Sequence, residues 1–131
     1  MTVTLNTSLQ NRQVDSWGDD LNSGFIDIYT GSQPAPGDAP TGTLLVSCAL
    51  NAAAYDPAVD GVAAKNGAIT GTGVGNGSAG YAQQRNAANT RWQYASVSLN
   101  GGGGDLQLSV LGITIGATVT IDASTITQPS S

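Results

Sequence analysis

The stretch that decides the fold is Thr43–Leu50, TLLVSCAL. Successive side chains of an extended chain point to opposite sides, so every second residue shares a face. One face of this stretch is wholly apolar: Leu44, Val46, Cys48 and Leu50. The alternation predicts a β-strand with that face in a hydrophobic core. Cys48 is then expected to be a buried, unreactive thiol, because no His or Lys neighbours it in sequence to stabilise the thiolate.

Three further stretches have the composition of strands: Phe25–Thr30, Arg91–Leu99 and Ala117–Thr127. In the last of them the alternation slips, because Ile126 falls on the face that carries the threonines. Such a slip predicts a bulge, or a change of strand partner, near Ser124.

The spacing of turn residues sets the overall architecture. From Gly24 onward, turn signals recur roughly every ten residues and leave about seven or eight short strands. A chain of 131 residues suits one domain. We therefore predict a mainly β protein, a β-sandwich or jelly-roll-like domain over residues 24–128. A short N-terminal helix or arm over residues 1–23 precedes it, and a tail over residues 129–131 follows it.

The N-terminal segment Thr2–Ser23 is the stretch with helical spacing. It begins with residues that can cap a helix by accepting a backbone N–H bond: Asn6, Thr7 and Ser8. A narrow apolar stripe follows: Leu9, Val14, Trp17 and Leu21. The stripe predicts either an arm that contacts a neighbouring subunit or a cap on one end of the sandwich, and the sequence leaves both open.

Glycine and proline predict the loops. Gly31–Gly42 holds three prolines and three glycines, which predicts a long surface loop, partly polyproline-like. Gly71–Gly80 holds five glycines in ten residues and is expected to be a flexible surface loop unless contacts with a ligand or a neighbour order it. Its Gly75–Gly80 matches the GxGxxG pattern of dinucleotide sites, but no acid follows until Asp105 and no helix is indicated. Gly101–Gly104 is expected to be a flexible turn.

The composition excludes several classes of function. The chain has no His and one Cys, so it can form neither a Ser-His-Asp triad nor a His- or multi-Cys zinc site. Four basic residues and a net charge of −5 argue against nucleic acid and against an anionic membrane surface. No apolar run approaches the ~20 residues of a membrane span. The first residues, MTVTLNTSLQ, have neither the basic start nor the apolar core expected of a secretion signal. We expect no enzymatic activity, cofactor or metal.

Two sets of residues could in principle bind a ligand: pairs of acids and a pair of aromatic residues. The acid pairs Asp19–Asp20 and Asp56–Asp60 lack the alternating oxygen ligands of a calcium loop. The Asp-Pro and Asp-Gly sequences that begin at Asp56 and Asp60 are expected to form turns instead. Trp92 and Tyr94 share a strand face and suit either the core, a protein interface or a sugar-stacking platform.

The stretch Phe25–Leu50, FIDIYTGSQPAPGDAPTGTLLVSCAL, carries a resemblance to a known group of proteins. Together with the aromatic strand Arg91–Val97 and the closing ATVTIDASTITQP of Ala117–Pro129, it resembles small virion proteins of tailed bacteriophages. The closest functional match is the capsid cement, or decoration, protein of short-tailed phages.

The resemblance implies a jelly-roll-like sandwich that oligomerises on the outer capsid and staples neighbouring capsid subunits. Its partners would be the phage major capsid protein and copies of itself. It would be made in the bacterial host cytoplasm and reside on the outer surface of the virion. Two alternatives stay open: a phage tail or neck structural protein, and a carbohydrate-binding module built on Trp92, Tyr94 and a loop Asp.

We predict that two segments contact neighbouring subunits, Thr2–Trp17 and Gln33–Thr41. Both are hard to bury within a small sandwich, and proline stiffens a loop so that docking orders less chain. The predicted contact residues are the apolar and stiff ones: Leu5, Leu9, Val14, Trp17, Pro34, Pro36 and Pro40.

Overall fold

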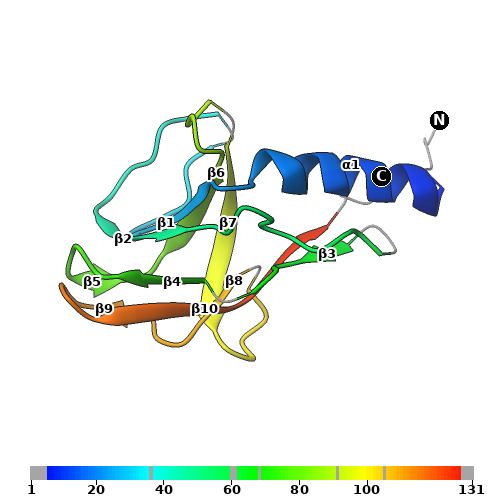
Figure 1. The fold of residues 1–131 in the computed structure, drawn as a ribbon. Helices are drawn as coiled ribbons and strands as arrows, with labels where there is room; N and C mark the ends of the chain where they lie inside the picture. Colours follow the sequence, from blue (N-terminus) through cyan, green and yellow to red (C-terminus); the bar gives the residue numbers. More distant parts are fainter. Residues whose placement is uncertain are drawn as a thin grey trace.

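The computed structural model describes residues 6–35, 37–59, 62–67, 69–90, 92–104 and 106–127. These residues form one helix and ten strands, and the strands dominate, so the predicted mainly β fold with an N-terminal helix is confirmed (Figure 1). The elements in chain order are α1 (Thr7–Asp20), β1 (Phe25–Tyr29), β2 (Leu44–Ala49), β3 (Val62–Ala64), β4 (Ile69–Thr72), β5 (Gly77–Ser78), β6 (Tyr81–Arg85), β7 (Trp92–Leu99), β8 (Leu106–Leu108), β9 (Gly112–Ile113) and β10 (Thr118–Thr127). The predicted tail, residues 129–131, lies outside the described residues.

Helix α1 begins where the sequence predicts. Asn6 is its N-cap, and the Asn6 side-chain oxygen accepts a hydrogen bond from the Leu9 backbone N–H at 2.9 Å. The helix packs on β3 and β10 through its second half, where Val14 and Gly18 are buried and Trp17 is half-buried against the core. Its first half extends away from the strands (Figure 1).

The strands form one curled sheet. Its order is β2-β1-β6-β7-β8-β10-β3, and β4 also pairs with β10. The pairs are antiparallel, apart from the parallel pair β7–β8. Strand β10 pairs with β4 over Thr118–Ile121 and with β3 over Thr125–Thr127, and its register with β8 shifts between Ile121 and Ala123. The predicted bulge and change of partner near Ser124 are therefore both present.

The chain after β4 curls this sheet into a nearly closed, sandwich-like barrel. The Val74 N–H donates to the Leu45 carbonyl of β2 at 2.7 Å, which joins the two ends of the sheet. Close approach requires glycine here, since a Cβ on Gly71 would lie 2.7 Å from Val46 Cγ2 and 2.9 Å from Cys48 Sγ. The expectation that Gly71–Gly80 is a flexible surface loop is thus wrong: the segment contains β5 and closes the barrel.

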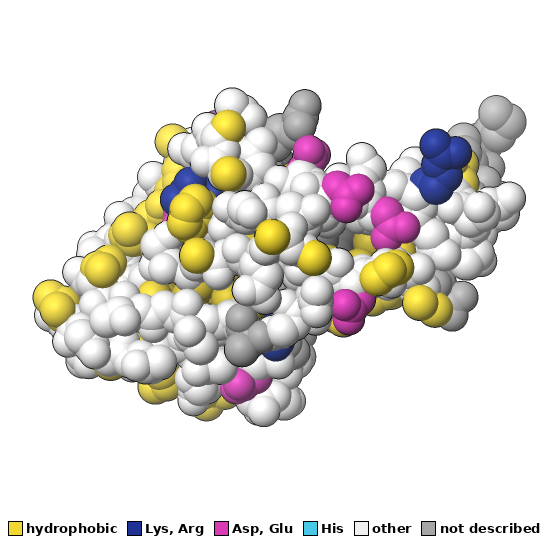
Figure 2. All heavy atoms as spheres, viewed as in Figure 1, with side chains coloured by type: hydrophobic (Ala, Val, Ile, Leu, Met, Phe, Trp, Pro, Cys, Tyr) yellow, Lys and Arg dark blue, Asp and Glu magenta, His cyan; other side chains and the backbone are white. Residues whose placement is uncertain are grey.

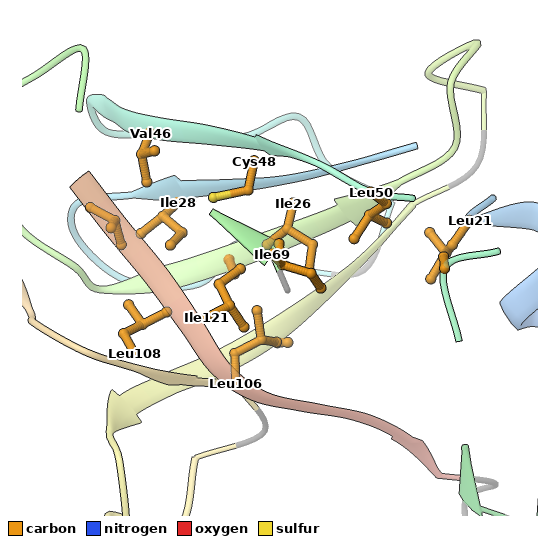
Figure 3. Packing of buried hydrophobic residues seen from close by; sticks show 14 of the residues in the cluster. Leu21, Ile26, Ile28, Val46, Cys48, Leu50, Ile69, Leu106, Leu108 and Ile121 are labelled. Carbon is orange, nitrogen blue, oxygen red and sulfur yellow. The ribbon is translucent and has the colours of Figure 1, made fainter. Parts of the chain in front are cut away.

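The core fills the barrel with aliphatic side chains from most of the strands (Figure 3). Its fully enclosed members include Leu21, Ile26, Ile28, Leu45, Val46, Cys48, Ile69, Leu106, Leu108, Ile113, Val119 and Ile121. The burial of Cys48 is as predicted. Burial, and to a lesser degree the charge of Asp27, raises the pKa of the Cys48 thiol to about 11, so it stays protonated at neutral pH.

One polar cluster lies inside the core and is hydrogen-bonded throughout. The Gln84 amide nitrogen donates to the Tyr55 hydroxyl at 2.9 Å and to Ser124 Oγ at 3.2 Å. Tyr55 and Ser124 are themselves bonded at 2.8 Å, and the Gln93 amide donates to Gln84 Oε1. Buried polar groups that find such partners are tolerated in an apolar interior.

Candidate functional site

The outer face of β1, β6 and β7 carries most of the large polar and aromatic side chains. The register aligns three rows across these strands: Phe25–Arg85–Trp92, Asp27–Gln83–Tyr94 and Tyr29–Tyr81–Ser96. Five of the seven aromatic residues of the chain therefore stand on one side of the sheet, opposite the core. Trp92 and Tyr94 are both half-buried, so of the roles their pattern suggested, the core is excluded.

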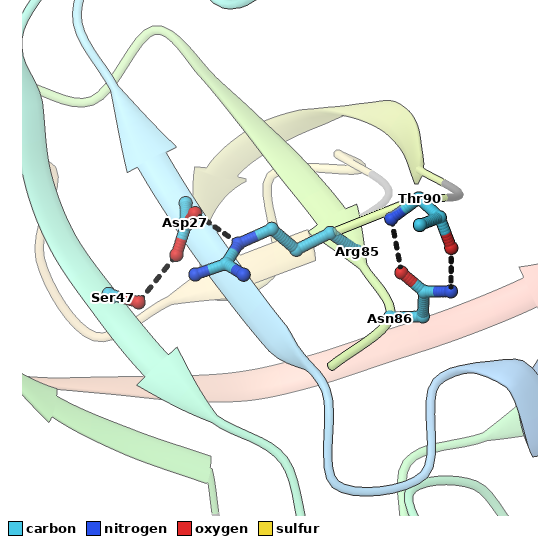
Figure 4. Close-up of polar contacts among 5 residues, drawn as sticks. All are labelled: Asp27, Ser47, Arg85, Asn86 and Thr90. Carbon is cyan, nitrogen blue, oxygen red and sulfur yellow. Dashed lines mark hydrogen bonds and ion pairs between the residues drawn. The ribbon is translucent and has the colours of Figure 1, made fainter. Parts of the chain in front are cut away.

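An ion pair occupies the middle of this face. Arg85 Nε donates to Asp27 Oδ2 at 2.7 Å, and Ser47 Oγ donates to the other oxygen, Oδ1, at 2.5 Å (Figure 4). The Arg85 guanidinium carbon also lies 4.3 Å from the centroid of the Phe25 ring, within the range of a cation–π contact. These contacts fix the guanidinium in place and balance its charge with that of Asp27.

Tyrosine hydroxyls hold the proline-rich loop against the same face. The Tyr81 hydroxyl accepts from the Thr41 N–H at 2.9 Å and donates to the Thr41 carbonyl. The Tyr94 hydroxyl donates to the Asp38 carbonyl at 2.5 Å. The Tyr81 ring stacks on Tyr29 at 5.4 Å and meets Tyr94 edge-on at 5.5 Å. The loop is therefore tied down beside the ion pair by the aromatic rows.

Between the loop and the strands lies a groove of about 400 Å³, which we call the outer-face groove. Its lining combines polar and apolar side chains: Asp27, Tyr29, Ala39, Pro40, Gln83, Arg85, Asn89 and Trp92. Trp92 also lines a neighbouring hollow of about 210 Å³, together with Gln33, Gly37 and Tyr94. The volume and the mixture of apolar walls with a few polar groups are typical of small-molecule sites.

Gln83 stands out on the floor of the groove. It is 3% exposed, yet among the described residues its side-chain amide has no hydrogen-bond partner. A glutamine amide offers two donors and two acceptor lone pairs. Among the described residues, the fully buried side-chain nitrogens and oxygens without a partner are Trp17 Nε1 and Trp92 Nε1, so the Gln83 amide still faces solvent in the groove. The side chain is thus held in the groove by the strand register rather than by hydrogen bonds of its own.

The rim of the groove is rigid near Asn89. The Asn86 side chain closes the turn from β6 to β7, accepting from the Thr90 N–H and donating to Thr90 Oγ1, each at 2.9 Å (Figure 4). This turn sets Asn89 at a φ of 57°.

Burial, followed by the charge of Asp27, raises the pKa of Tyr29, so its hydroxyl stays protonated at neutral pH.

The residues that we predicted as interface contacts divide into four groups. Val14 is 2% exposed and belongs to the core of its own chain, so its assignment to a contact surface is withdrawn; Trp17 is half-buried against the same core. Leu9 is 45% exposed and free for a contact. Pro34 and Pro40 are half-buried in the loop, and Pro40 lines the groove. Leu5 and Pro36 lie outside the described residues.

Acidic side chains gather where α1 meets the barrel (Figure 2). Asp15, Asp19 and Asp56 line a hollow of about 410 Å³ there, and Asp15 accepts the Ala58 N–H at 2.7 Å. Within the described part of the chain, no three His, Cys, Asp or Glu side chains come close enough to hold a metal ion. In the described part of the chain, the helix α1 is too short and too polar to cross a membrane.

The sequence pattern did not single out Asp27, Gln83 or Arg85. Asp27 interrupts a short apolar run, and Gln83 and Arg85 follow a glycine-rich stretch, so each resembles an ordinary solvent-facing residue. The alternation of Phe25, Asp27 and Tyr29 was the available signal, since it marks a second face of the strand that is neither apolar nor freely hydrated.

Comparisons with protein-family models, with curated proteins and with solved structures found no match to this chain.

Proposed function

We propose that this chain is a non-enzymatic structural protein of a tailed-phage virion, which binds the outer capsid lattice and stabilises it as a cement protein. The resemblance of Phe25–Leu50 to small phage virion proteins supports this role. The low content of charged residues, 10%, also suits a protein with large contact areas, because the centres of interfaces are poor in charge.

The observation that carries the proposal is the first half of α1. From Thr7 to Gln13 no side chain is buried, and this half of the helix extends beyond the barrel (Figure 1). Helices shorter than about 12–15 residues are marginal in water unless an apolar face packs on something. Leu9 is the one apolar side chain of this half and is 45% exposed, so the arm suits contact with a second protein.

A modest contact suffices for a cement protein. A protein that binds the assembled lattice and not the free subunit stabilises the assembled state by mass action. Many symmetric copies on one capsid, and contacts between copies, add to the total stabilisation. The closed barrel supplies a rigid body for such a contact, while the helix supplies the reach.

The test is binding of purified variants to capsids of the encoding phage from which this protein is missing. Leu9→Asp places a charge on the arm, and we expect at least about a tenfold loss of occupancy in co-sedimentation, with lost protection of the capsid against heat. Val110→Asp is the control, since it also puts a charge on an exposed apolar residue but lies away from α1. Unchanged occupancy for Leu9→Asp would contradict the arm contact.

The location of the protein tests the alternative that it is a tail or neck structural protein. If virions labelled with an antibody to this chain carry it on the tail or neck and not on the head, the cement role is wrong and the tail or neck role replaces it.

A further inference from the structure

We infer that the outer-face groove is a binding site for a neutral saccharide. The groove and the first half of α1 share no residue, so the saccharide site and the proposed capsid role can be tested separately.

Gln83 presents its side-chain amide to the groove without a partner in the described part of the chain. This side chain is 97% removed from solvent, and within the described chain it is left without a hydrogen bond on the floor of an open groove. A ligand with paired hydroxyl groups can donate to the amide oxygen and accept from the amide nitrogen. Such a ligand would take the place of the solvent that reaches this amide in the free protein.

Arg85 and Asn89 extend this polar surface. Arg85 Nε donates to Asp27, and the guanidinium lies over the Phe25 ring. The two terminal nitrogens of Arg85 have no bond to another described residue. Those nitrogens and the exposed side-chain amide of Asn89 offer further hydrogen-bonding groups at the groove, and the turn holds the Asn89 backbone through the bond from its N–H to the Asn86 carbonyl at 3.0 Å. The planar guanidinium, held by Asp27 and Phe25, is well matched to adjacent hydroxyls on a ring.

The ion pair decides between a neutral and an anionic ligand. Asp27 lies 2.7 Å from Arg85 and balances its positive charge. A ligand carboxylate or phosphate would approach Asp27 as well as Arg85, and like charges at such distances repel. A neutral polyhydroxy compound meets no such penalty.

The apolar part of the groove fits one face of a sugar ring. The walls include the half-buried Trp92 indole, the Tyr29 ring and Pro40. Aromatic rings combine a large apolar surface with a polar edge, so they can pack on the C–H face of a saccharide while the hydroxyls reach Gln83 and Arg85. The neighbouring hollow, which Trp92 also lines, leaves room for a second ring.

The strand arrangement disfavours a peptide as the ligand. Strand β6, which forms the floor, is paired with β1 on one side and β7 on the other. Its backbone groups are thus used within the sheet, and an extended peptide could not add to it as a further strand. Recognition must come from side chains alone.

The test uses the Trp17→Phe variant, in which Trp92 is the one remaining tryptophan. Its fluorescence is titrated with maltotriose, cellotriose and chitotriose, with 3′-sialyllactose as the anionic probe and deca-proline as the peptide probe. We expect a saturable change with at least one neutral trisaccharide. Adding Gln83→Leu or Arg85→Met should weaken that binding about tenfold or more, whereas Gln13→Leu, on the exposed part of α1, should not change it.

The inference would be overturned by any of three results: no neutral trisaccharide binds, binding is unaffected by Gln83→Leu and Arg85→Met, or only the anionic or peptide probe binds. Capsid co-sedimentation of the Gln83→Leu variant separates the two proposals. It should match the unsubstituted protein, so a failed saccharide titration leaves the capsid role standing, and a failed capsid assay leaves the groove standing.

Discussion

Gln83 and Gln84 are adjacent, chemically identical and almost equally buried, at 3% and 1% exposure, yet they lie on opposite faces of β6. Gln84 points into the barrel and is bonded to Tyr55, Ser124 and Gln93. Gln83 points into the outer-face groove and has no side-chain partner among the described residues. The polar side chains of the inner face are thus bonded within the chain, whereas on the outer face the amide of Gln83 is left open to the groove.

This difference separates two kinds of burial. A side chain enclosed by its own chain contributes to stability, and its removal leaves a cavity or an unpaired partner. A side chain covered by neighbours but left unpaired contributes little to stability, and its removal should be felt in binding instead. Substitutions on the inner face should therefore change stability, and substitutions in the outer-face groove should change binding.

The largest effect is expected where the inner face has no room. Gly71→Val would place side-chain atoms against Val46 and Cys48, where even a Cβ would lie 2.7 Å from Val46 Cγ2. We expect the free energy of unfolding in urea to fall by about 3 kcal/mol, the upper part of the range for overpacked cores.

Gly112→Val is the matched control for Gly71→Val. Gly112 is also in a strand, but a Cβ there would meet nothing within 4 Å, so stability should stay within about 0.5 kcal/mol. Equal losses for the two variants would show that the closure of the barrel by β4 is not tight.

The next effect is a dependence of stability on pH that comes from Cys48. Burial, with a smaller contribution from Asp27, raises the pKa of its thiol from 9.0 to about 11 in the folded state. Between these values the unfolded chain has lost the proton and the folded chain has kept it. Stability is therefore fully present below pH 9 and falls as pH rises, by about 2 kcal/mol near pH 11.

Urea unfolding of the protein and of Cys48→Ala from pH 8 to pH 11 measures this dependence. The variant should show a shallower decline over that range, and the remaining slope should reflect the tyrosines, since burial also raises the pKa of Tyr55 and Tyr29. Parallel curves for the two proteins would contradict a shifted thiol.

A smaller loss is expected from the glutamine pair itself. Gln84→Leu removes the amide that bonds Tyr55 and Ser124 and leaves the Gln93 amide unpaired, so unfolding should require about 1.5 kcal/mol less. Gln83→Leu breaks no bond to a described residue and should leave stability within about 0.5 kcal/mol. A loss from Gln83→Leu as large as that from Gln84→Leu would remove the distinction between the faces.

The sequence was sufficient to predict the local features of this structure. Alternation predicted the strands around Phe25–Thr30 and Thr43–Leu50, Asn6 was among the predicted helix caps, and the slip at Ile126 predicted the bulge in β10. Each of these signals is local, because it depends on residues next to one another in the chain.

What the sequence could not predict depends on contacts between distant segments. Gly71 and Gly112 look alike in the sequence, but only the first lies against β2. Likewise the groove arises because β1, β6, β7 and the proline-rich loop converge, and no local pattern distinguishes Gln83 from Gln84. Which glycine is needed for close approach and which glutamine is left unpaired are properties of the assembled barrel.

The smallest effect concerns the loop that forms one wall of the groove. Tyr81→Phe removes the hydroxyl that bonds both the N–H and the carbonyl of Thr41. Thr41 is exposed, so water can replace these bonds, and we expect stability to fall by only about 1 kcal/mol. The local effect is sharper: hydrogen exchange at the Thr41 amide should become faster by about tenfold, because the loop can open without the rest of the barrel. Tyr29→Phe is the control, since its ring stacks on Tyr81 but its hydroxyl has no hydrogen bond to another described residue. If Tyr29→Phe speeds exchange at Thr41 as much as Tyr81→Phe does, the loop is held by ring packing, and the outer face is more like the inner one than the contrast between the two glutamines suggests.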